Sequence, residues 1–245
     1  MGVTEERDVR FPTLYGKKCL GTVSCIAGLP ANLTQFTWSL ANLMQFGQEY
    51  ICQPGEFIHL DPVAVSYHAK ARNAAVDRFL GDWIFFLDTD HVFDPDLLSR
   101  LLTLQYAYDL EVVSGNYFQR VPPFYPVTCR FEENSERLIM DLDKETGKLR
   151  WGPQDSLYEL ENGGTGGGCL LIQRSVFPKL RKLGMGEPFE NLPPWYEDYS
   201  FFWRCHEAGV KCWLAPRVEC HHLQVRPVSQ KDHVEAMKKW GVENE

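Results

Sequence analysis

Apolar runs and stretches with helical spacing alternate along the first half of the chain. Short apolar runs bounded by glycine or proline are typical of buried strands, and apolar residues three or four apart are typical of amphipathic helices. Strands are predicted at residues 21–28, 49–52, 83–87 and 111–118. Helices are predicted at residues 32–46, 61–80 and 96–108, the second because Asp61-Pro62 is typical of a capped helix start. This alternation predicts a three-layer α/β fold.

The regular alternation stops after residue 118. Residues 137–151 are predicted to form a β-hairpin, and residues 169–172 an apolar strand behind a glycine-rich run. A helix at residues 199–208, a strand through Trp213 and a surface helix at residues 230–240 follow. Because no linker or repeat interrupts the chain, we expect one continuous domain over residues 21–222, with an extension at 1–20 and a helical tail at 223–245.

An apolar strand that ends in two carboxylates is the most informative feature of the sequence. Trp83 to Leu87 is rich in aromatic and β-branched residues, and Asp88-Thr89-Asp90 follows it directly. Ligands bind at the edge of a parallel sheet where the strands end. Asp88 and Asp90 share one strand parity, and two neighbouring carboxylates repel each other unless a cation lies between them. The pattern therefore indicates a divalent metal, and with it a ligand that contains phosphate.

Other interpretations of the Asp-x-Asp triplet exist. A plain turn is the simplest, because aspartate is common in turns that follow strands. An EF-hand loop requires glycine at its sixth position and glutamate at its twelfth, where this chain has Phe93 and Ser99. The Asp-x-Asp-x-Val motif of haloacid-dehalogenase-type phosphatases fits residues 88–92, with Asp88 as nucleophile and Asp90 as acid. This phosphatase is the main enzymatic alternative.

Composition restricts the class of protein and its partners. The 245 residues are 44% hydrophobic, which indicates a packed core, and they carry a formal net charge of −8. That charge argues against general binding to nucleic acid or to anionic membranes. No apolar window is long enough for a membrane span, and the charged N-terminus does not resemble a signal peptide. We therefore expect a cytoplasmic protein without a membrane span.

The eight cysteines are expected to be reduced thiols, because none forms a C-x-x-C pair and several lie in apolar runs. A structural zinc is the alternative for one group that combines thiols with imidazoles, although its spacing fits no standard zinc finger. The members of that group are Cys205, His206, Cys212, Cys220, His221 and His222.

The glycine-rich run Gly163 to Gly168 leads into a strand. It lacks the Gly-Lys-Ser/Thr ending of a phosphate-binding Walker loop. One interpretation is a backbone that lets a ligand approach closely, with amide groups free to bind oxygen. The alternative is a flexible bend or bulge.

Two further segments carry candidate polar chemistry. Trp195 to Asp198 follows two prolines at a predicted helix start. The helix dipole stabilises carboxylates at such a position, which is one explanation of Glu197 and Asp198. The other is that one of them is a general base beside an aromatic platform for a sugar. Arg72-Asn73 lies within a predicted helix upstream of the two aspartates. Asparagine is disfavoured inside helices, so a polar task such as contact with a nucleotide is one explanation and an exposed face is the other.

His221 and His222 end a strand-like run near the C-terminus. Neutral imidazole is the commonest nitrogen ligand of divalent metals, so one of the two histidines could complete a site begun by Asp90. A surface histidine without such a role is the alternative for either residue.

Together these segments resemble GT-A glycosyltransferases of the broad family 2 type. The resemblance spans residues 23–222 and rests on five blocks that stand in the family's order. The blocks are Ala71-Arg72-Asn73 with Phe85 to Asp90, Phe93 to Leu98, Gly115 to Phe118, Gly164 to Phe177, and Glu197-Asp198. The resemblance implies a Rossmann-like three-layer sandwich with a mainly parallel sheet. Its nucleotide-binding half would span about residues 21–118 and its acceptor half about residues 119–222.

The resemblance also implies a hexosyltransferase that moves a sugar from a nucleotide-diphosphate sugar, a UDP- or GDP-sugar, to an acceptor hydroxyl. Mn²⁺ or Mg²⁺ would bridge the diphosphate, held by Asp88, Asp90 and His222. In an inverting enzyme Asp198 would be the general base, with Glu197 orienting the sugar or the base. By motif position, the donor-binding residues would be Ala27, Arg72, Asn73, Asp88, Gly166, Gly167, Gly168 and Trp195. A non-catalytic nucleotide-sugar-binding module of GT-A shape is a second alternative beside the phosphatase.

Overall fold

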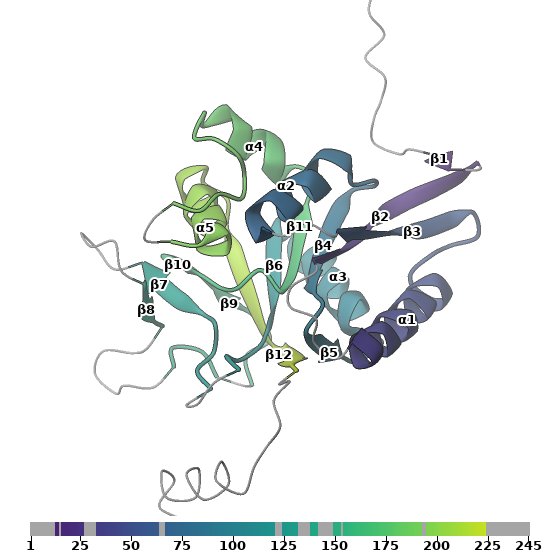
Figure 1. The fold of residues 1–245 in the computed structure, drawn as a ribbon, viewed down its shortest axis with the longest axis horizontal. Helices are drawn as coiled ribbons and strands as arrows, with labels where there is room; N and C mark the ends of the chain where they lie inside the picture. The colour runs from purple at the N-terminus through teal and green to yellow at the C-terminus, as the bar shows by residue number, and fades with distance from the viewer. Residues whose placement is uncertain are drawn as a thin grey trace, which may run out of the picture.

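The computed structural model describes residues 13–14, 16–26, 33–63, 67–120, 124–131, 138–141, 149–152, 154–192 and 195–223. A large sheet forms the centre of this part of the chain, with helices on both faces (Figure 1). The helices are α1 (Leu33–Tyr50), α2 (His68–Arg78), α3 (Leu97–Tyr108), α4 (Val176–Lys182) and α5 (Glu197–Glu207).

The central sheet has the strand order β3-β2-β4-β11-β6-β12-β5, with β1 also paired to β2 and β9 to β12. Its strands are β1 (Thr13–Leu14), β2 (Lys17–Ile26), β3 (Glu56–Val63), β4 (Trp83–Asp88), β5 (His91–Phe93), β6 (Val112–Asn116), β9 (Tyr158–Glu159), β11 (Cys169–Gln173) and β12 (Cys212–His222). β2 pairs in parallel with β3 and β4, and β12 with β6, whereas β11 is antiparallel to both β4 and β6. Five of the long strands therefore share one direction, which confirms the mainly parallel sheet.

Strand β4 shows why the fold has three layers. All but one of its residues are fully buried, and successive side chains point to opposite faces of the sheet. Ile84 and Phe86 pack into the core beneath α2, α4 and α5, whereas Trp83, Phe85 and Leu87 pack into the core beneath α1 and α3. The same division of helices is visible in Figure 1.

The second strand lies later in the chain than predicted. Residues 49–50 are the end of α1, and β3 covers Asp61-Pro62, where a helix start was expected. Both predictions were wrong for a tertiary reason. Among the described strands β3 pairs with β2 alone, and a strand with one partner tolerates a proline that lacks an N–H. The Asp61 carboxylate accepts hydrogen bonds from Arg78 at the end of α2 and so does not cap a helix.

The remaining predicted elements are largely confirmed. The helices predicted at 32–46, 96–108 and 199–208 are α1, α3 and α5, and the strand at 169–172 is β11. A small second sheet contains β10 (Gly163–Gly164), β7 (Cys129–Phe131) and β8 (Leu138–Met140) in that order. The turn of the hairpin predicted at 137–151, and the helix predicted at 230–240, lie outside the described residues.

Two findings bear on the expected class of protein. No helix among the described residues is long and apolar enough to cross a membrane. All eight cysteines are free, and most of them are buried in the core. One member of the cysteine–histidine group considered for zinc, His206, instead uses its Nε2 at 2.7 Å from the carbonyl oxygen of Gly163.

Candidate functional site

The ends of β4, β5 and β12 meet at one corner of the sheet. β4 ends at Asp88, the turn Thr89-Asp90 reverses the chain, and β5 begins at His91. β5 pairs antiparallel with the end of β12, in a register that places His222 opposite His91. The two imidazole rings are stacked, with their centroids 4.2 Å apart. Residues 131 positions apart in the sequence are thereby held side by side by backbone pairing.

This corner contains a group of side chains suited to a metal ion. Among the described residues, Asp90, His91 and His222 each offer a ligand atom, and these atoms lie within 4.8 Å of one another. Oδ1 of Asp90 and Nε2 of His91 are buried and have no hydrogen-bond partner within the described part of the chain. A buried polar atom without a partner is costly, and a bound cation would relieve that cost at both atoms. The donor set of one carboxylate and two imidazoles fits a divalent transition metal.

The surroundings of His91 and His222 leave a nitrogen lone pair available for a metal ion. Burial, together with the neighbouring His222, lowers the pKa of His91 from 6.5 to about 4, so its imidazole is neutral near pH 7. Nδ1 of His222 is hydrogen bonded to the carbonyl oxygen of Phe118. A histidine whose Nδ1 donates to a carbonyl keeps the lone pair of Nε2 for a metal. His221, the other candidate, is exposed and lies outside the group.

The two aspartates of the triplet have different partners. Oδ2 of Asp90 forms an ion pair with Arg120, whereas Oδ1 of Asp88 accepts a hydrogen bond of 3.1 Å from Nη2 of Arg72. Burial alone would raise the pKa of Asp88, but the positive charge of Arg72, which is the largest opposing influence, lowers it overall. Asp88 is therefore ionised and paired on the α2 side, next to the group formed by Asp90 and the histidines.

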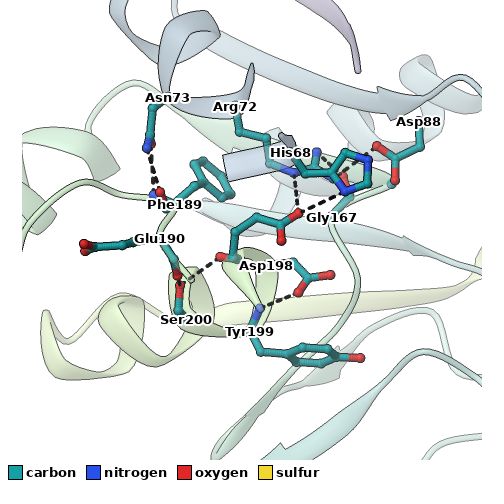
Figure 2. A network of polar contacts seen from close by, with 12 residues as sticks. His68, Arg72, Asn73, Asp88, Gly167, Phe189, Glu190, Asp198, Tyr199 and Ser200 are labelled. Atoms are coloured by element: carbon teal, nitrogen blue, oxygen red, sulfur yellow. Dashed lines mark hydrogen bonds and ion pairs between the residues drawn. The ribbon is translucent and has the colours of Figure 1, made fainter. Parts of the chain in front are cut away.

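Arg72 connects several parts of the site (Figure 2). Its side chain is only 2% exposed and lies between β4 and the start of α5. Nη1 donates to the carbonyl oxygen of Gly167 at 2.9 Å, and Nε lies 3.7 Å from a carboxylate oxygen of Glu197. His68 also approaches Glu197, at 3.8 Å. One buried guanidinium thus balances the carboxylates of two different predicted motifs.

Asp198 has the most unusual acidity among the candidate residues. Burial and the adjacent Glu197 raise the pKa of Asp198 from 3.8 to about 7, although Arg72 acts in the opposite direction. Oδ1 of Asp198 accepts a hydrogen bond of 2.8 Å from the backbone amide of Tyr199 (Figure 2). A carboxylic acid with a pKa near 7 can accept a proton at neutral pH far better than an ordinary aspartate.

The glycines of residues 166–168 are required by the side chains around them. A Cβ at Gly166 would lie 2.0 Å from the hydroxyl of Tyr117, and one at Gly167 would lie 2.8 Å from Cζ of Arg72. A Cβ at Gly168 would lie 2.6 Å from Cε1 of His91. The amide of Gly168 donates to the Tyr117 hydroxyl at 2.9 Å. The run therefore allows the polar side chains of the site to pack against backbone, which neither sequence interpretation included.

The remaining predicted donor-binding residues lie in other settings. The side-chain amide of Asn73 donates to the carbonyl of Phe189 at 2.6 Å and accepts from its amide at 3.0 Å (Figure 2). Asn73 thus fixes the segment before α5 to helix α2. Trp195 packs between Phe131 and Trp203, with ring centroids 5.1 Å and 5.5 Å away. Ala27 lies outside the described residues. Their contacts with a donor stay predictions.

Three residues of the site were missed from the sequence. His91 and Arg120 directly contact Asp90, and Tyr117 packs edge-on against the rings of both His91 and His222. His91 directly follows the two predicted aspartates, and an imidazole next to two carboxylates is the sequence signal that could have identified it. Arg120 follows β6, and no local pattern reveals that the segment after β6 approaches Asp90.

Comparison with known proteins gives the context of this site. The chain matches the family model described as Glycosyl transferase family 2 over residues 48–180. It is also similar to a solved structure described as the crystal structure of GalNAc-T7 with UDP, GalNAc and Mn²⁺, with a TM-score of 0.51 and 11% sequence identity. That similarity covers 89% of this chain and 48% of the other, so the chain spans about half the length of that protein. No curated protein matches the chain.

Because the sequence identity is only 11%, the structural match shows that the two proteins share a fold, the GT-A fold, but not that they share an activity. The family match is independent of it, covers more than half of the chain and includes Arg72, both aspartates of the triplet and the glycine-rich run. The chain belongs to glycosyl transferase family 2.

Proposed function

We propose that this protein is a metal-dependent glycosyltransferase that moves a sugar from a nucleotide-diphosphate sugar to an acceptor hydroxyl. The observation that carries the proposal is the convergence of Asp90, His91 and His222 at the corner of the sheet, within a chain of glycosyl transferase family 2. We further propose that residues 21–222 act as a single catalytic domain. Its nucleotide-binding half would end near residue 118, and its acceptor half would begin there.

In this proposal Asp90 and His222 hold Mn²⁺ or Mg²⁺, and His91 joins them as a third candidate ligand. The metal, when bound, would neutralise negative charge on the nucleoside diphosphate as it leaves. Asp88 lies beside this group with its side chain 24% exposed, so it can accept a hydrogen bond from the ribose or from metal-bound water. Arg72 is nearly inaccessible and acts as a positioning residue that keeps Asp88 ionised and oriented.

Asp198 is the candidate general base of an inverting reaction. Its raised pKa of about 7 makes it half ionised at neutral pH, so it can take the proton of an acceptor hydroxyl. Glu197 is 3.7 Å from Arg72 and holds the start of α5 against α2. That contact supports a role of Glu197 in orienting Asp198 and the sugar.

The phosphatase alternative receives less support. It would need Asp88 as an attacking nucleophile, whereas Oδ1 of Asp88 is engaged by Arg72. The family of the chain is one of transferases. A UDP-sugar is the first donor to test, because the solved structure with the same fold contains UDP and Mn²⁺.

The test is a thermal-shift screen with UDP, GDP, ADP, CDP and dTDP, each with and without Mn²⁺. Ligand binding to the native state raises the melting temperature by mass action. We expect one nucleotide to give a metal-dependent shift that is lost in Asp90→Ala. The exposed Asp94, four residues away, supplies the matched control Asp94→Ala, in which the shift should persist.

The candidate donor is then supplied with Mn²⁺, and release of its free nucleoside diphosphate is measured. Release that requires Asp198 would support transfer or slow hydrolysis of the donor sugar. Tight metal-dependent nucleotide binding without turnover of any donor would favour the non-catalytic binding module. No nucleotide shift, combined with a shift for metal plus a phosphate mimic, would favour the phosphatase.

A further inference from the structure

Arg120 places a positive charge on the carboxylate expected to bind the metal. Its guanidinium forms an ion pair with Oδ2 of Asp90, whose side chain is only 4% exposed. The other oxygen, Oδ1, lies 3.4 Å from Nδ1 of His91 and has no hydrogen-bond partner among the residues that the structure describes. The guanidinium is thus bound to one of the two oxygens through which Asp90 could bind a metal ion.

The backbone on either side of Arg120 is anchored. The amide of Gln119 donates to the carbonyl of Tyr125 at 2.8 Å, and the amide of Val127 donates to the carbonyl of Tyr117 at 3.2 Å. These bonds keep Arg120 next to the end of β12, where His222 is bonded to the preceding Phe118. The Arg120 side chain itself is 40% exposed. Its position is therefore fixed at the backbone while its guanidinium has room to change partner.

A cavity lies within reach of this side chain. It has a volume of about 490 Å³ and is lined by Arg120 and by His222, one member of the metal-type group of Asp90, His91 and His222. The residues that line it are Phe118, Gln119, Arg120, Phe124, Cys220, His221 and His222. Arginine suits a site of this kind, because its planar fork binds phosphate oxygens through two parallel hydrogen bonds.

A guanidinium on Oδ2 and a divalent cation on Oδ1 of the same Asp90 carboxylate lie close enough to repel each other strongly. We propose that Arg120 competes with the divalent metal for Asp90, is displaced when the metal binds, and then pairs with the diphosphate of the donor. This inference rests on the proposed function and adds an order of events to it. Metal binding alone is opposed by loss of the Asp90–Arg120 pair, and the donor compensates by giving Arg120 a new anion.

The competition gives Arg120→Gln two effects of opposite sign. Without nucleotide, the variant should bind Mn²⁺ about threefold to tenfold more tightly, because no ion pair has to be broken. With Mn²⁺ saturating, it should bind UDP about threefold to tenfold more weakly, because a charge-assisted contact is lost. Isothermal titration calorimetry measures both constants and requires no turnover.

Two further variants make the experiment specific. Arg120→Lys keeps a positive charge but loses the fork, so its Mn²⁺ affinity should stay close to that of the wild type while its UDP affinity falls. Arg181→Gln is the matched control, because Arg181 is a half-exposed arginine paired with Asp77 on the far helices α2 and α4. It removes the same charge and should change neither constant.

Unchanged or weaker Mn²⁺ binding by Arg120→Gln would overturn the competition. Tighter Mn²⁺ binding with unchanged UDP binding would overturn the transfer of Arg120 to the diphosphate. If neither wild type nor Arg120→Gln binds Mn²⁺ at all, the proposed metal site itself fails, which is a different result. Far-ultraviolet circular dichroism of each variant establishes that the comparison is made between folded proteins.

Discussion

Nη2 of Arg72 donates to Oδ1 of Asp88 over 3.1 Å, and this buried pair joins helix α2 to the end of β4. The same guanidinium binds the carbonyl oxygen of Gly167 and lies beside Glu197 at the start of α5. Three segments that are distant in the sequence therefore meet at one positive charge. The arrangement explains why arginine is needed there, since a single lysine ammonium cannot present separate donors to a carboxylate and a carbonyl in fixed directions.

Removal of that charge should destabilise the protein strongly. In Arg72→Met the side-chain volume is largely kept, but Asp88 and Glu197 lose their shared partner in a poorly hydrated place. We expect the free energy of unfolding to fall by about 3 kcal/mol, as for other pairs in which one buried charge is left alone. Urea unfolding followed by tryptophan fluorescence measures the change.

An arginine in a similar but exposed pair provides the control. Arg78 donates to Asp61 at 2.9 Å, yet its side chain is 48% exposed. Arg78→Met should lower the free energy of unfolding by less than about 1 kcal/mol, because water screens such a pair. An equal decrease in the free energy of unfolding in the two variants would show that burial does not make the Arg72 pair more stabilising than the exposed Arg78 pair.

Much of this architecture could be predicted from the sequence because its signals are local. The apolar run of β4 with its two carboxylates, the helical spacing of α1 and α3, and the glycine-rich lead into β11 depend on residues close in the chain. The prediction at Asp61-Pro62 was wrong because the decisive interaction, parallel pairing of β3 with β2, joins distant segments. Local propensity is a weak prior wherever tertiary pairing decides.

Prediction of the site from the sequence also depends on contacts between segments that are distant in the chain. Asp88, Asp90 and His222 were predicted together from a motif, but the partners that distinguish them, Arg72 and Arg120, come from α2 and from the segment after β6. Sequence spacing places two aspartates on one side of a strand only while the strand continues. Here the strand ends at Asp88, and the turn directs Asp90 toward β12.

The close approach of Tyr117 to the glycine-rich run can be tested by a double-mutant cycle. In Gly166→Ala the added methyl would lie 2.0 Å from the Tyr117 hydroxyl, so the variant should lose about 1–3 kcal/mol of stability by overpacking. Tyr117→Phe removes the clashing oxygen, and Gly166→Ala should then cost less in that background. Thermal unfolding of the four proteins gives the coupling, and Gly152→Ala, whose Cβ would meet nothing closer than 3.7 Å, is the control.

That cycle also separates two roles of the run. If the glycines serve only as a flexible bend, Gly166→Ala should change the free energy of unfolding by the same small amount as the control Gly152→Ala, through backbone entropy alone. That amount should not depend on the residue at position 117. A coupling of zero between positions 166 and 117 would contradict the packing described here.

Substitution of the two adjacent histidines at the end of β12 should affect Mn²⁺ binding differently. His222 belongs to the metal-type group and stacks on His91, whereas His221 is exposed on the other side of the strand. His222→Ala should weaken Mn²⁺ binding by at least about tenfold, comparable to or larger than the loss of an outer-shell partner in other metal sites. His221→Ala should leave Mn²⁺ binding unchanged.

Calorimetric titration of Mn²⁺ into both variants gives the comparison. The substitutions remove the same side chain from neighbouring positions, so general effects on β12 appear in both. A similar loss in the two variants would mean that strand geometry, not ligation by His222, is being measured.

Asp198 should make stability depend on pH in the neutral range. Its pKa is about 7 in the folded protein and 3.8 in the absence of burial and of Glu197. Between these values the native state holds a proton that the unfolded chain has released, so stability falls as pH rises. The contribution is complete below about pH 4 and is lost as pH rises through about 7. Asp198→Asn cannot titrate there, so its stability relative to wild type should increase from about pH 4 to about pH 7 and stay constant above that, as measured by urea unfolding.

The same titration should limit the reaction if Asp198 is the base. A general base acts only when ionised, so the rate of sugar transfer at low donor concentration should rise with pH, with its midpoint near pH 7, and level off about one pH unit above that. Asp198→Asn should lose that transition together with most of the activity, while its metal-dependent nucleotide binding persists because the metal-type group does not include it. A pH profile with the same midpoint in the residual activity of Asp198→Asn would assign the titration to another group. In that case the raised pKa of Asp198 would be only a consequence of its burial beside Glu197.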